Sequence, residues 1–438
     1  MNRRTTTFLI TAFVTIAVSA CAGASGERQD TDTTITVFGP YRGADADHFI
    51  ESVQEFTDQT GVQVRYTGSA DFVPDLVRRT GEANDPPDVA MVPQPGVMRQ
   101  LADGDRIVAL GDGALDALIA NYSSEARALG EIGGVPFGVP FRANIKSLVW
   151  YRPSLFAERG WTVPRSLDEL DRLAVTISDG DDMEPWCVGL AAGAATGWPA
   201  TDWTEDLVLR LAGPEAYHQW SVGELPFASP AVSEAFERFR TLALVPGRLD
   251  GGVTAAIETP TSSVMRPLLG DTPGCAMVKQ ADFASGWLPA GTTIGSDGDV
   301  AWFVLPDVAA SDGPPPLVVG GDFAVQFRRD PVVDSFMAFL AGPRAGESWA
   351  RRGGFLSPKA TFDVALYPTD TERAFAGLLA DAQELAFDAS DQMPAGIGSG
   401  LLWQGITKWV AGVLTYEQFA QLIDGAFAAS DPTLVVVP

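Results

Sequence analysis

The sequence predicts an α/β fold organised as two lobes, and two observations support this prediction. Near the amino-terminal end, short β-branched segments alternate with segments of helical spacing, a pattern typical of a parallel sheet covered by helices. The chain has 438 residues and is 46% hydrophobic, which is enough for two domains or one large two-lobed fold with a sizeable core.

The first predicted unit is a strand followed by a helix. Thr34–Phe38 is β-branched and apolar and runs into a Gly-Pro pair, as the end of a strand does. Phe49 and Phe56 belong to an apolar face at helical spacing. Asp45 or Asp47 is the candidate cap for this helix, and Gly61 is expected to end it.

Two further strands are predicted at Val62–Tyr66 and Pro87–Val92. In open α/β sheets, ligands bind beyond the carboxyl ends of the strands. The loops that follow the three strands are therefore candidate walls of a binding site: Gly39–Gly43, Gly68–Phe72 and Pro93–Gly96.

Later segments carry local signals of a hairpin and of helix starts. Glu131–Phe141 contains two glycines followed by alternating residues, which predicts a hairpin. Ser166 with Glu169, and Thr415 with Gln418, have the spacing of capping boxes, so each pair predicts the start of a helix.

The amino-terminal segment has the layout of a secretory signal. Arg3 and Arg4 precede an uncharged apolar run that is too short to span a bilayer. The junction that ends at Cys21 resembles a bacterial lipobox, which implies a diacylglyceryl group on the Cys21 thiol and cleavage before it. We therefore predict a lipoprotein signal peptide at 1–20, a lipid-anchored flexible tether at 21–33, and a location outside the cytoplasmic membrane. The alternative is an ordinary cleaved signal with an unrelated cysteine.

Charge and composition exclude several classes of function. There are 30 basic and 56 acidic residues, a formal net charge of −26, which disfavours binding to nucleic acid, anionic lipid headgroups or strongly anionic solutes. The chain has only two histidines and three cysteines, so neither a zinc site nor a Ser-His-Asp triad is expected.

The two remaining cysteines are a candidate disulfide. If Cys21 carries lipid, Cys187 and Cys275 are left as an even pair in an oxidising compartment. The alternative is two unrelated buried thiols.

The densest local motif is Gly189–Trp203, GLAAGAATGWPATDW. Trp198 and Trp203 flank Asp202, and an aromatic face beside a carboxylate suits a sugar, whose C–H face packs on the ring while its hydroxyls donate to the carboxylate. The alternative is that the tryptophans belong to the core.

A second motif, Phe387–Pro394, places Asp388 and Asp391 in a predicted turn, where the alternative role of such side chains is to cap backbone groups. Three weaker patterns are glycine-containing loops with charged or aromatic residues: Gly68–Phe72, Val319–Asp322 and Arg351–Phe355.

Two other kinds of site are weakly supported. Paired acids are also the machinery of glycoside hydrolases, but with 56 acidic residues close pairs arise by chance. The aspartates at 179–182 do not fit the spacing of an EF-hand calcium loop.

Taken in order, these motifs resemble the family 1 extracellular solute-binding proteins of bacterial ABC transporters, and most of all the α-glucoside-binding branch. The paired cysteines also fit this branch. The matching stretches are PQPG at Pro93–Gly96, NIKSLVWY at Asn144–Tyr151, ATGWPATDWTED at Ala195–Asp206, GGD at Gly320–Asp322 and FDASDQMP at Phe387–Pro394.

The resemblance implies a two-lobed periplasmic-binding-protein-like fold of type II, with a ligand cleft between lobes that are joined by hinge crossings. The expected N-terminal lobe is 34–142 plus about 317–355, and the C-terminal lobe is 143–316 plus about 356–438. Such a protein is monomeric, needs no cofactor or metal and catalyses nothing. It binds an α-glucoside or another neutral oligosaccharide and delivers it to the membrane subunits of an ABC permease.

The resemblance also implies which residues bind the sugar. The expected ligand-binding set is Asp71, Phe72, Gln94, Trp198, Asp202, Trp203, Asp322, Arg351, Asp388 and Asp391. Two alternatives remain at this stage: a sugar-sensing or adhesive lipoprotein on the same scaffold, and a cell-envelope glycosidase that uses paired carboxylates. The motifs do not decide the sugar, its linkage or the role of the apolar end TLVVVP.

Overall fold

The computed structural model describes residues 34–81, 83–180, 183–270, 273–311 and 313–429. The predicted signal peptide, the lipidation site Cys21, the tether and the apolar stretch 433–438 lie outside the described residues. None of the described helices has the length and apolar character that crossing a membrane requires.

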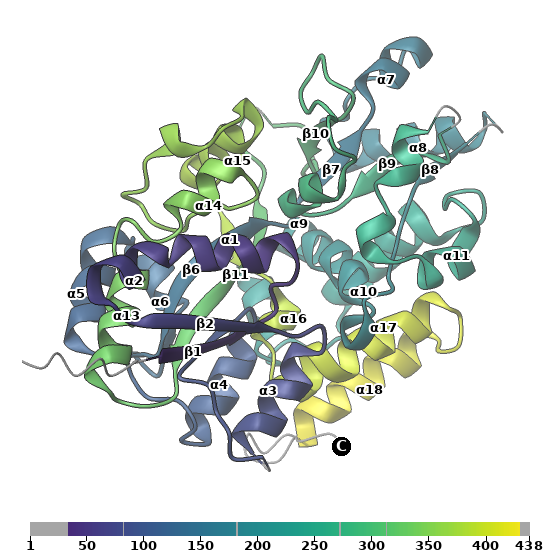
Figure 1. Cartoon of the computed structure of the whole chain (residues 1–438). Coiled ribbons are helices and arrows are strands. Elements are labelled where there is room, and N and C mark those ends of the chain that lie inside the picture. Colours follow the sequence, from purple (N-terminus) through teal and green to yellow (C-terminus); the bar gives the residue numbers. More distant parts are fainter. Residues whose placement is uncertain (1–33, 82, 181–182, 271–272, 312, 430–438) are drawn as a thin grey trace, which may run out of the picture.

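The chain forms two lobes, each built around its own sheet (Figure 1). In the larger sheet the strands lie in the order β2, β1, β3, β11, β12, and β6 pairs with β11. β1 is parallel to β2 and β3, whereas β11 is antiparallel to β3 and β6. The strand bounds are β1 (Thr34–Gly39), β2 (Gln63–Gly68), β3 (Val89–Val92), β6 (Gly138–Ile145), β11 (Leu317–Gln326) and β12 (Leu385–Phe387).

The second sheet has the order β10, β7, β9, β8. Its strands are β7 (Leu148–Tyr151), β8 (Glu184–Trp186), β9 (Cys275–Lys279) and β10 (Ala301–Val304). The predicted hairpin is confirmed as β4 (Glu131–Ile132) and β5 (Val135–Pro136). The predicted disulfide is confirmed as well: Cys187 and Cys275 are bonded, with Cα atoms 5.5 Å apart, and the bond ties the end of β8 to the start of β9.

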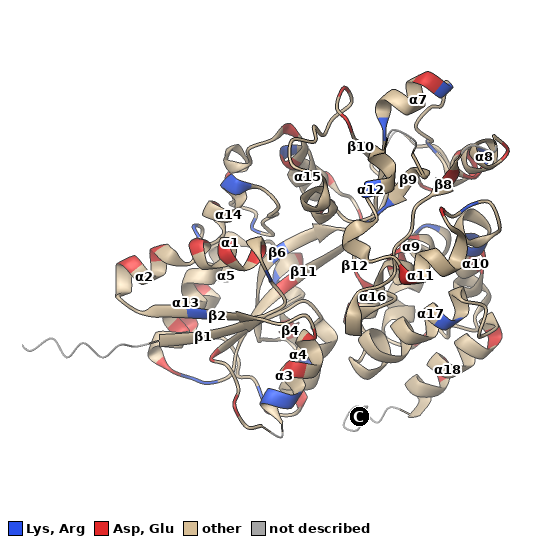
Figure 2. Cartoon of the chain, turned by 45° about the vertical axis from the view of Figure 1, so that its right-hand side comes forward, with Lys and Arg blue, Asp and Glu red and all other residues tan. Residues whose placement is uncertain are grey.

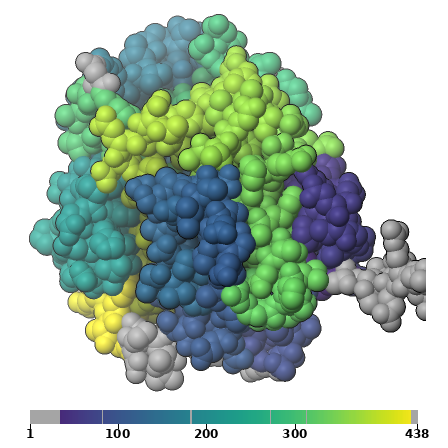
Figure 3. Space-filling model, turned by 90° about the vertical axis from the view of Figure 1, so that its left-hand side faces the viewer, coloured from purple at the N-terminus to yellow at the C-terminus, as the bar shows by residue number. Residues whose placement is uncertain are grey.

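Helices cover the larger sheet. α1 packs against α14, and α5 packs against α13, so that segments more than 200 residues apart in sequence lie side by side (Figure 3). These helices are α1 (Ala44–Ser52), α2 (Gln54–Thr60), α3 (Phe72–Thr80), α4 (Pro95–Asp103), α5 (Asp112–Asn121), α6 (Ser124–Ala128), α13 (Pro331–Ala341) and α14 (Glu347–Arg352).

The other lobe is mostly helical. Its longest helix, α9, packs against α10, α16 and α17. The helices are α7 (Pro153–Arg159), α8 (Leu167–Ser178), α9 (Trp198–Ser221), α10 (Pro230–Phe239), α11 (Gly252–Glu258), α12 (Arg266–Leu269), α15 (Asp370–Asp381), α16 (Ala389–Gln392), α17 (Trp403–Val410) and α18 (Tyr416–Ala429).

Both predicted capping boxes begin helices. The Glu169 amide donates to Ser166 Oγ at 3.2 Å, at the start of α8. The Gln418 amide donates to Thr415 Oγ1 at 3.3 Å, and the Thr415 amide donates to Gln418 Oε1 at 2.9 Å. The second pair is reciprocal, whereas the Glu169 carboxylate accepts from the Arg165 amide at 2.8 Å; both arrangements satisfy amides at the start of a helix.

The first predicted helix differs from the expectation in two ways. It is divided at Val53 into α1 and α2. Its end is as predicted: Gly61 adopts the left-handed conformation, with φ 76°, and ends α2. Asp45 and Asp47 were wrong choices of cap: Gly43 occupies the N-cap position. The Asp45 carboxylate instead approaches Arg142, with 3.5 Å between Oδ2 and Nη1.

Three of the four lysines in the chain are buried. Lys359 donates to the carbonyl of Ala345 at 2.7 Å, and burial lowers its pKa to about 7. Lys146 and Lys279 form buried ion pairs near the junction of the lobes, whereas Lys408 is exposed on α17. Acidic residues, by contrast, are spread over the helices of both lobes (Figure 2).

Candidate functional site

The sheet topology places one group of loops at the junction of the lobes. β12 pairs with β11 at Leu317–Val319, and β3 pairs with the same edge at Phe323–Gln326. The stretch Gly320–Asp322 is left uncovered between the two short strands. Gln94 follows β3, and Asp388 follows β12, so both segments arrive at this gap.

Lys146 is the central cation of the candidate site. It follows β6, and its Nζ lies 3.2 Å from Asp202 Oδ1 on α9 and 3.2 Å from Asp388 Oδ2 at the start of α16. The ammonium also lies over the Trp198 ring, 4.8 Å from its centroid. Asp202, Asp388 and Trp198 were all predicted from the sequence, and one unpredicted lysine brings them together.

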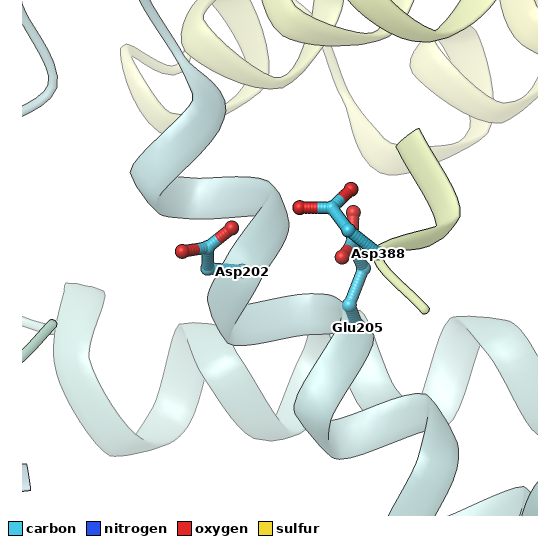
Figure 4. A group of neighbouring side chains, drawn as sticks. All are labelled: Asp202, Glu205 and Asp388. Atoms are coloured by element: carbon cyan, nitrogen blue, oxygen red, sulfur yellow. The ribbon is translucent and has the colours of Figure 1, made fainter. Parts of the chain in front are cut away.

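Three buried carboxylates, two of which pair with this lysine, lie close together (Figure 4). Asp202, Glu205 and Asp388 each place an oxygen within 4.8 Å of the others. Asp388 Oδ1 accepts hydrogen bonds from Ser390 Oγ at 2.8 Å and from the Asp391 amide at 3.0 Å. Three clustered carboxylates also suit a cation, but here the Lys146 ammonium supplies the positive charge.

Burial shifts the proton affinity of these carboxyls. Desolvation raises the pKa of Asp202 to about 7, although Lys146 lowers it. Desolvation, followed by the charges of Asp388 and Asp202, raises the pKa of Glu205 well above its usual value. The pKa of Asp391 is raised in the same way, although Lys146 and a hydrogen bond from Gln94 lower it. These groups therefore retain protons at pH values where exposed carboxyls are ionised.

A second layer of charges fixes α9 against the crossing segment. Asp206, one turn after Asp202, accepts from Ser147 Oγ at 2.5 Å and pairs with Lys279 at 2.8 Å and Arg210 at 2.6 Å. Its pKa is lowered: Lys279 and Arg210 together outweigh the effect of burial. Because each charge is paired, this network holds the backbone of α9 in place and has no cation left for a ligand.

A separate polar group lies along β6 and β11. Arg142 faces Asp322 across the two strands, donates to the Gly354 carbonyl at 2.8 Å and lies over the Trp349 ring at 4.8 Å. Burial raises the pKa of Asp322, while Arg142 lowers it. Asp322 therefore lies at the junction. Its neighbour there is Arg142, a residue that the sequence did not single out.

Asp282 connects this second group to the other lobe. Its Oδ1 accepts from the Ile145 amide at 2.7 Å, and its pKa is raised to about 6 by burial, although that hydrogen bond and Arg142 lower it. Tyr41 packs at 5.2 Å from the Trp349 ring, and burial followed by the Asp322 charge raises its pKa.

Three of the predicted binding residues are placed elsewhere. Trp203 is a core residue, 1% exposed, that stacks on Phe239 with ring centroids 5.4 Å apart. Phe72 is buried within its own lobe against Phe38. Arg351 lies on the surface of α14 and pairs with Glu347 at 3.3 Å, so it does not join either polar group.

Asp71 lies at the outer edge of the junction. It is exposed at the start of α3, and its Oδ1 is 3.7 Å from the point where a Cβ on Gly193 would lie. Gly193 precedes α9, so this contact joins the two lobes. The two lobes thus approach each other both here and where Gln94 meets Asp391.

Helix geometry explains which residues of the tryptophan motif share a side. Residues four apart lie on one face of a helix, as Trp198 and Asp202 do, and Glu205 follows three residues later. Trp203, five residues after Trp198, is rotated by about 140°. The spacing 198, 202, 205 was therefore a signal in the sequence that identifies Glu205 and argues against Trp203.

Several buried polar atoms of the junction have no hydrogen-bond partner among the described residues. They come from the loop after β3 and from β6: Gln94 Oε1, Arg142 Nε and Asn144 Oδ1. A buried polar group without a partner costs about 1–3 kcal/mol. A molecule that offers several hydroxyls would supply the missing partners.

Comparison with known proteins agrees with this architecture. Residues 44–347 match the family described as bacterial extracellular solute-binding protein. The chain is 35% identical to the alpha-glucosides-binding periplasmic protein AglE of Rhizobium meliloti, over 86% of this chain and 84% of that protein. It is 34% identical to the osmoprotective compounds-binding protein GgtB of Synechocystis, over 91% of this chain and 93% of that protein.

Solved structures show the same fold. The bacterial solute receptor AcbH superposes with a TM-score of 0.76 at 18% identity, covering 91% of this chain and 98% of the receptor. The predicted α/β periplasmic-binding-protein fold is thereby confirmed, with mixed sheets in two lobes. The chain belongs to the bacterial extracellular solute-binding proteins, the non-enzymatic components that bind solutes for ABC transporters outside the cytoplasm.

Proposed function

We propose that this protein captures an α-glucoside or a related di- or oligosaccharide between its lobes and delivers it to the membrane subunits of an ABC importer. The name of one relative, an α-glucosides-binding protein, supports a neutral polyhydroxyl solute. We further propose that a lipid on Cys21 tethers the protein to the membrane.

The observation that carries the proposal is the set of unpartnered polar atoms at the junction. Two of them, on Gln94 and Asn144, are acceptors, whereas Arg142 Nε is a donor. A hydroxyl both donates and accepts, so a sugar suits a set that contains donors and acceptors.

The charges of the site support a neutral solute. Lys146 is engaged by Asp202 and Asp388, and Arg142 by Asp45 and a backbone carbonyl. An anionic solute would meet acids in excess of these two cations. Sugars avoid this repulsion, and the half-exposed face of Trp198 offers them an apolar surface.

We propose that the lobes divide as 34–142 with about 317–355, and 143–316 with about 356–438, and that they close over the sugar. The crossings would lie between β6 and β7, between β10 and β11, and after Phe355. Closure of this kind is an equilibrium between open and closed states that a ligand shifts by binding the closed state more tightly.

A thermal-shift screen of the protein lacking residues 1–21 tests the proposal. Maltose, trehalose and sucrose would be compared with anionic sugar phosphates as negative controls. A bound sugar at a hundred times its Kd should stabilise the protein by about 2.7 kcal/mol. No shift with any neutral sugar, or larger shifts with the phosphates, would contradict the proposal.

Two tryptophan variants separate the binding surface from the core. Trp198→Ala is expected to weaken sugar affinity roughly tenfold, about 1.4 kcal/mol, with little change in melting temperature, because its ring is partly exposed. Trp203→Phe is expected to lower the melting temperature and leave affinity unchanged, because its ring packs within the core. Titration calorimetry and thermal unfolding of both variants distinguish the two effects, and the reverse pattern would refute the assignment.

A further inference from the structure

Four buried carboxyl groups at the junction share a single ammonium group. Asp202, Glu205, Asp388 and Asp391 are each at most 8% exposed, and Lys146 is the cation among them. If all four were ionised, the group would carry a net charge of −3 away from water. An arrangement of this kind is relieved by proton uptake, because burial and like charges both favour the neutral acid.

The hydrogen bonds indicate which carboxyls carry the negative charge. Asp202 and Asp388 both pair with Lys146, and Asp388 also accepts two hydrogen bonds. Glu205 accepts one hydrogen bond, from the Ser390 amide at 3.1 Å, and its Oε2 has no partner. Neither Glu205 nor Asp391 forms an ion pair with any described residue.

Glu205 and Asp391 differ in what buries them. Glu205 lies on α9, fully buried within its own lobe. Asp391 is covered by the other lobe. The Gln94 side chain hydrogen-bonds the Asp391 carboxyl, and a Cβ on Gly96 would lie 3.1 Å from the backbone carbonyl oxygen of Asp391. Separation of the lobes would therefore return Asp391 to water and leave Glu205 buried.

We propose that Asp391 binds a proton when the lobes close on a sugar, so that sugar affinity rises as the pH falls. The proton is a second ligand of the closed state, and Asp391 is the residue that couples it to the sugar. This inference rests on the proposed function, because it requires the lobes to open and close around a solute.

The groups that face Asp391 determine the sign of the effect. Burial and the carboxylates of Asp388 and Asp202 raise its pKa, whereas Lys146 and the Gln94 amide lower it, and the net shift is upward. In the open state water replaces the cover that the other lobe provides, so the desolvation that raises the pKa of Asp391 is relieved. Between the two pKa values closure takes up as much as one proton, so Kd falls by as much as tenfold for each unit decrease in pH. Below or above that interval the slope disappears.

Titration calorimetry with maltose, trehalose and sucrose between pH 5 and 8.5 tests the proposal. Measurements in phosphate and in Tris, whose ionisation enthalpies differ, count the protons taken up and require no variant. We expect between about 0.5 and 1 proton per bound sugar, or about three- to tenfold in Kd per pH unit. A sugar affinity that is independent of pH, or that weakens as the pH falls, would overturn this inference alone. If none of the sugars binds, the proposed function and this inference are both overturned.

Variants assign the proton to its residue. Asp391→Asn imitates the neutral acid and should abolish the pH dependence, so that its Kd at pH 8 equals its own Kd at pH 5. Glu205→Gln should leave the slope unchanged, because Glu205 is buried in either state. Asp381→Asn, at an exposed position on α15, is the matched control. A slope that persists in Asp391→Asn would refute the assignment.

Discussion

Replacement of Lys146 by methionine tests the electrostatics of the site most directly. The side chain keeps its length and loses its charge, so Asp202 and Asp388 face each other without the ammonium that lies 3.2 Å from each. Removing one partner of a buried ion pair costs about 3–5 kcal/mol, since the remaining charge is left buried and unpaired. The free energy of unfolding at pH 8 should fall by about that amount.

The expected change in melting temperature follows from the size of the protein. An unfolding entropy of about 2.1 cal/mol/K per residue over roughly 400 residues gives ~0.8 kcal/mol/K. A loss of about 3–5 kcal/mol therefore corresponds to about 4–6 °C. Differential scanning calorimetry of the wild type, Lys146→Met and the exposed control Lys408→Met would measure it.

The pH dependence gives a second, independent readout. The folded pKa of Asp202 is raised to about 7 from 3.8, so the native state binds more protons than the unfolded state, and stability is lost as the pH rises from about 4 to 7. Without Lys146 this pKa rises further, so the total loss becomes larger and extends to higher pH. The loss of unfolding free energy in Lys146→Met, relative to the wild type, should be smaller at pH 5 than at pH 8. A deficit that matches Lys408→Met, or that is equal at both pH values, would refute this reasoning.

Two further predictions concern packing and the disulfide. Gly96→Ala should cost about 1–3 kcal/mol in stability and weaken sugar binding, because the new Cβ would lie 1.8 Å from a backbone carbonyl oxygen of the segment after α16. The control is Gly377→Ala, whose Cβ would have no heavy atom within 4 Å. Equal melting temperatures for the two variants would contradict the prediction. The double variant Cys187→Ser and Cys275→Ser should lose about 4 kcal/mol, because the bond closes a loop with a sequence separation of 88. Thermal unfolding with and without dithiothreitol measures the second effect, and reductant-independent stability of the wild type would argue against it.

Local features were predictable because neighbouring residues determine them. Ser166 and Glu169 carry the whole capping signal within one turn, and an even number of cysteines in an oxidising compartment leaves few pairings. Asp388 takes the capping role that was one of its two alternatives, because it accepts from the Asp391 amide at the start of α16. It also faces Lys146, and its part in sugar binding stays a prediction.

The remainder of the site depends on contacts that no local pattern contains. Lys146 lies in a stretch that resembles the family, but its role arises only when β6, α9 and α16 converge, with partners 56 and 242 residues further along the chain. Trp203 shows the opposite error: its neighbours in sequence suggested a binding role, whereas the turn of α9 directs its ring toward Trp186 and Phe239. Sequence proximity identifies the chemistry of a motif, and the helix period decides which members share a side.

The distribution of lysines has a practical consequence for labelling. Lys146, Lys279 and Lys359 are buried and engaged, so Lys408 on α17 is the lysine whose amine is accessible to acylating reagents. Among the side chains, an amine-reactive fluorophore should therefore attach to this one, alongside the terminal α-amino group. Lys408 lies on the lobe that carries α9 and α16, so a reporter placed there would monitor the movement of the opposite lobe without any engineered cysteine.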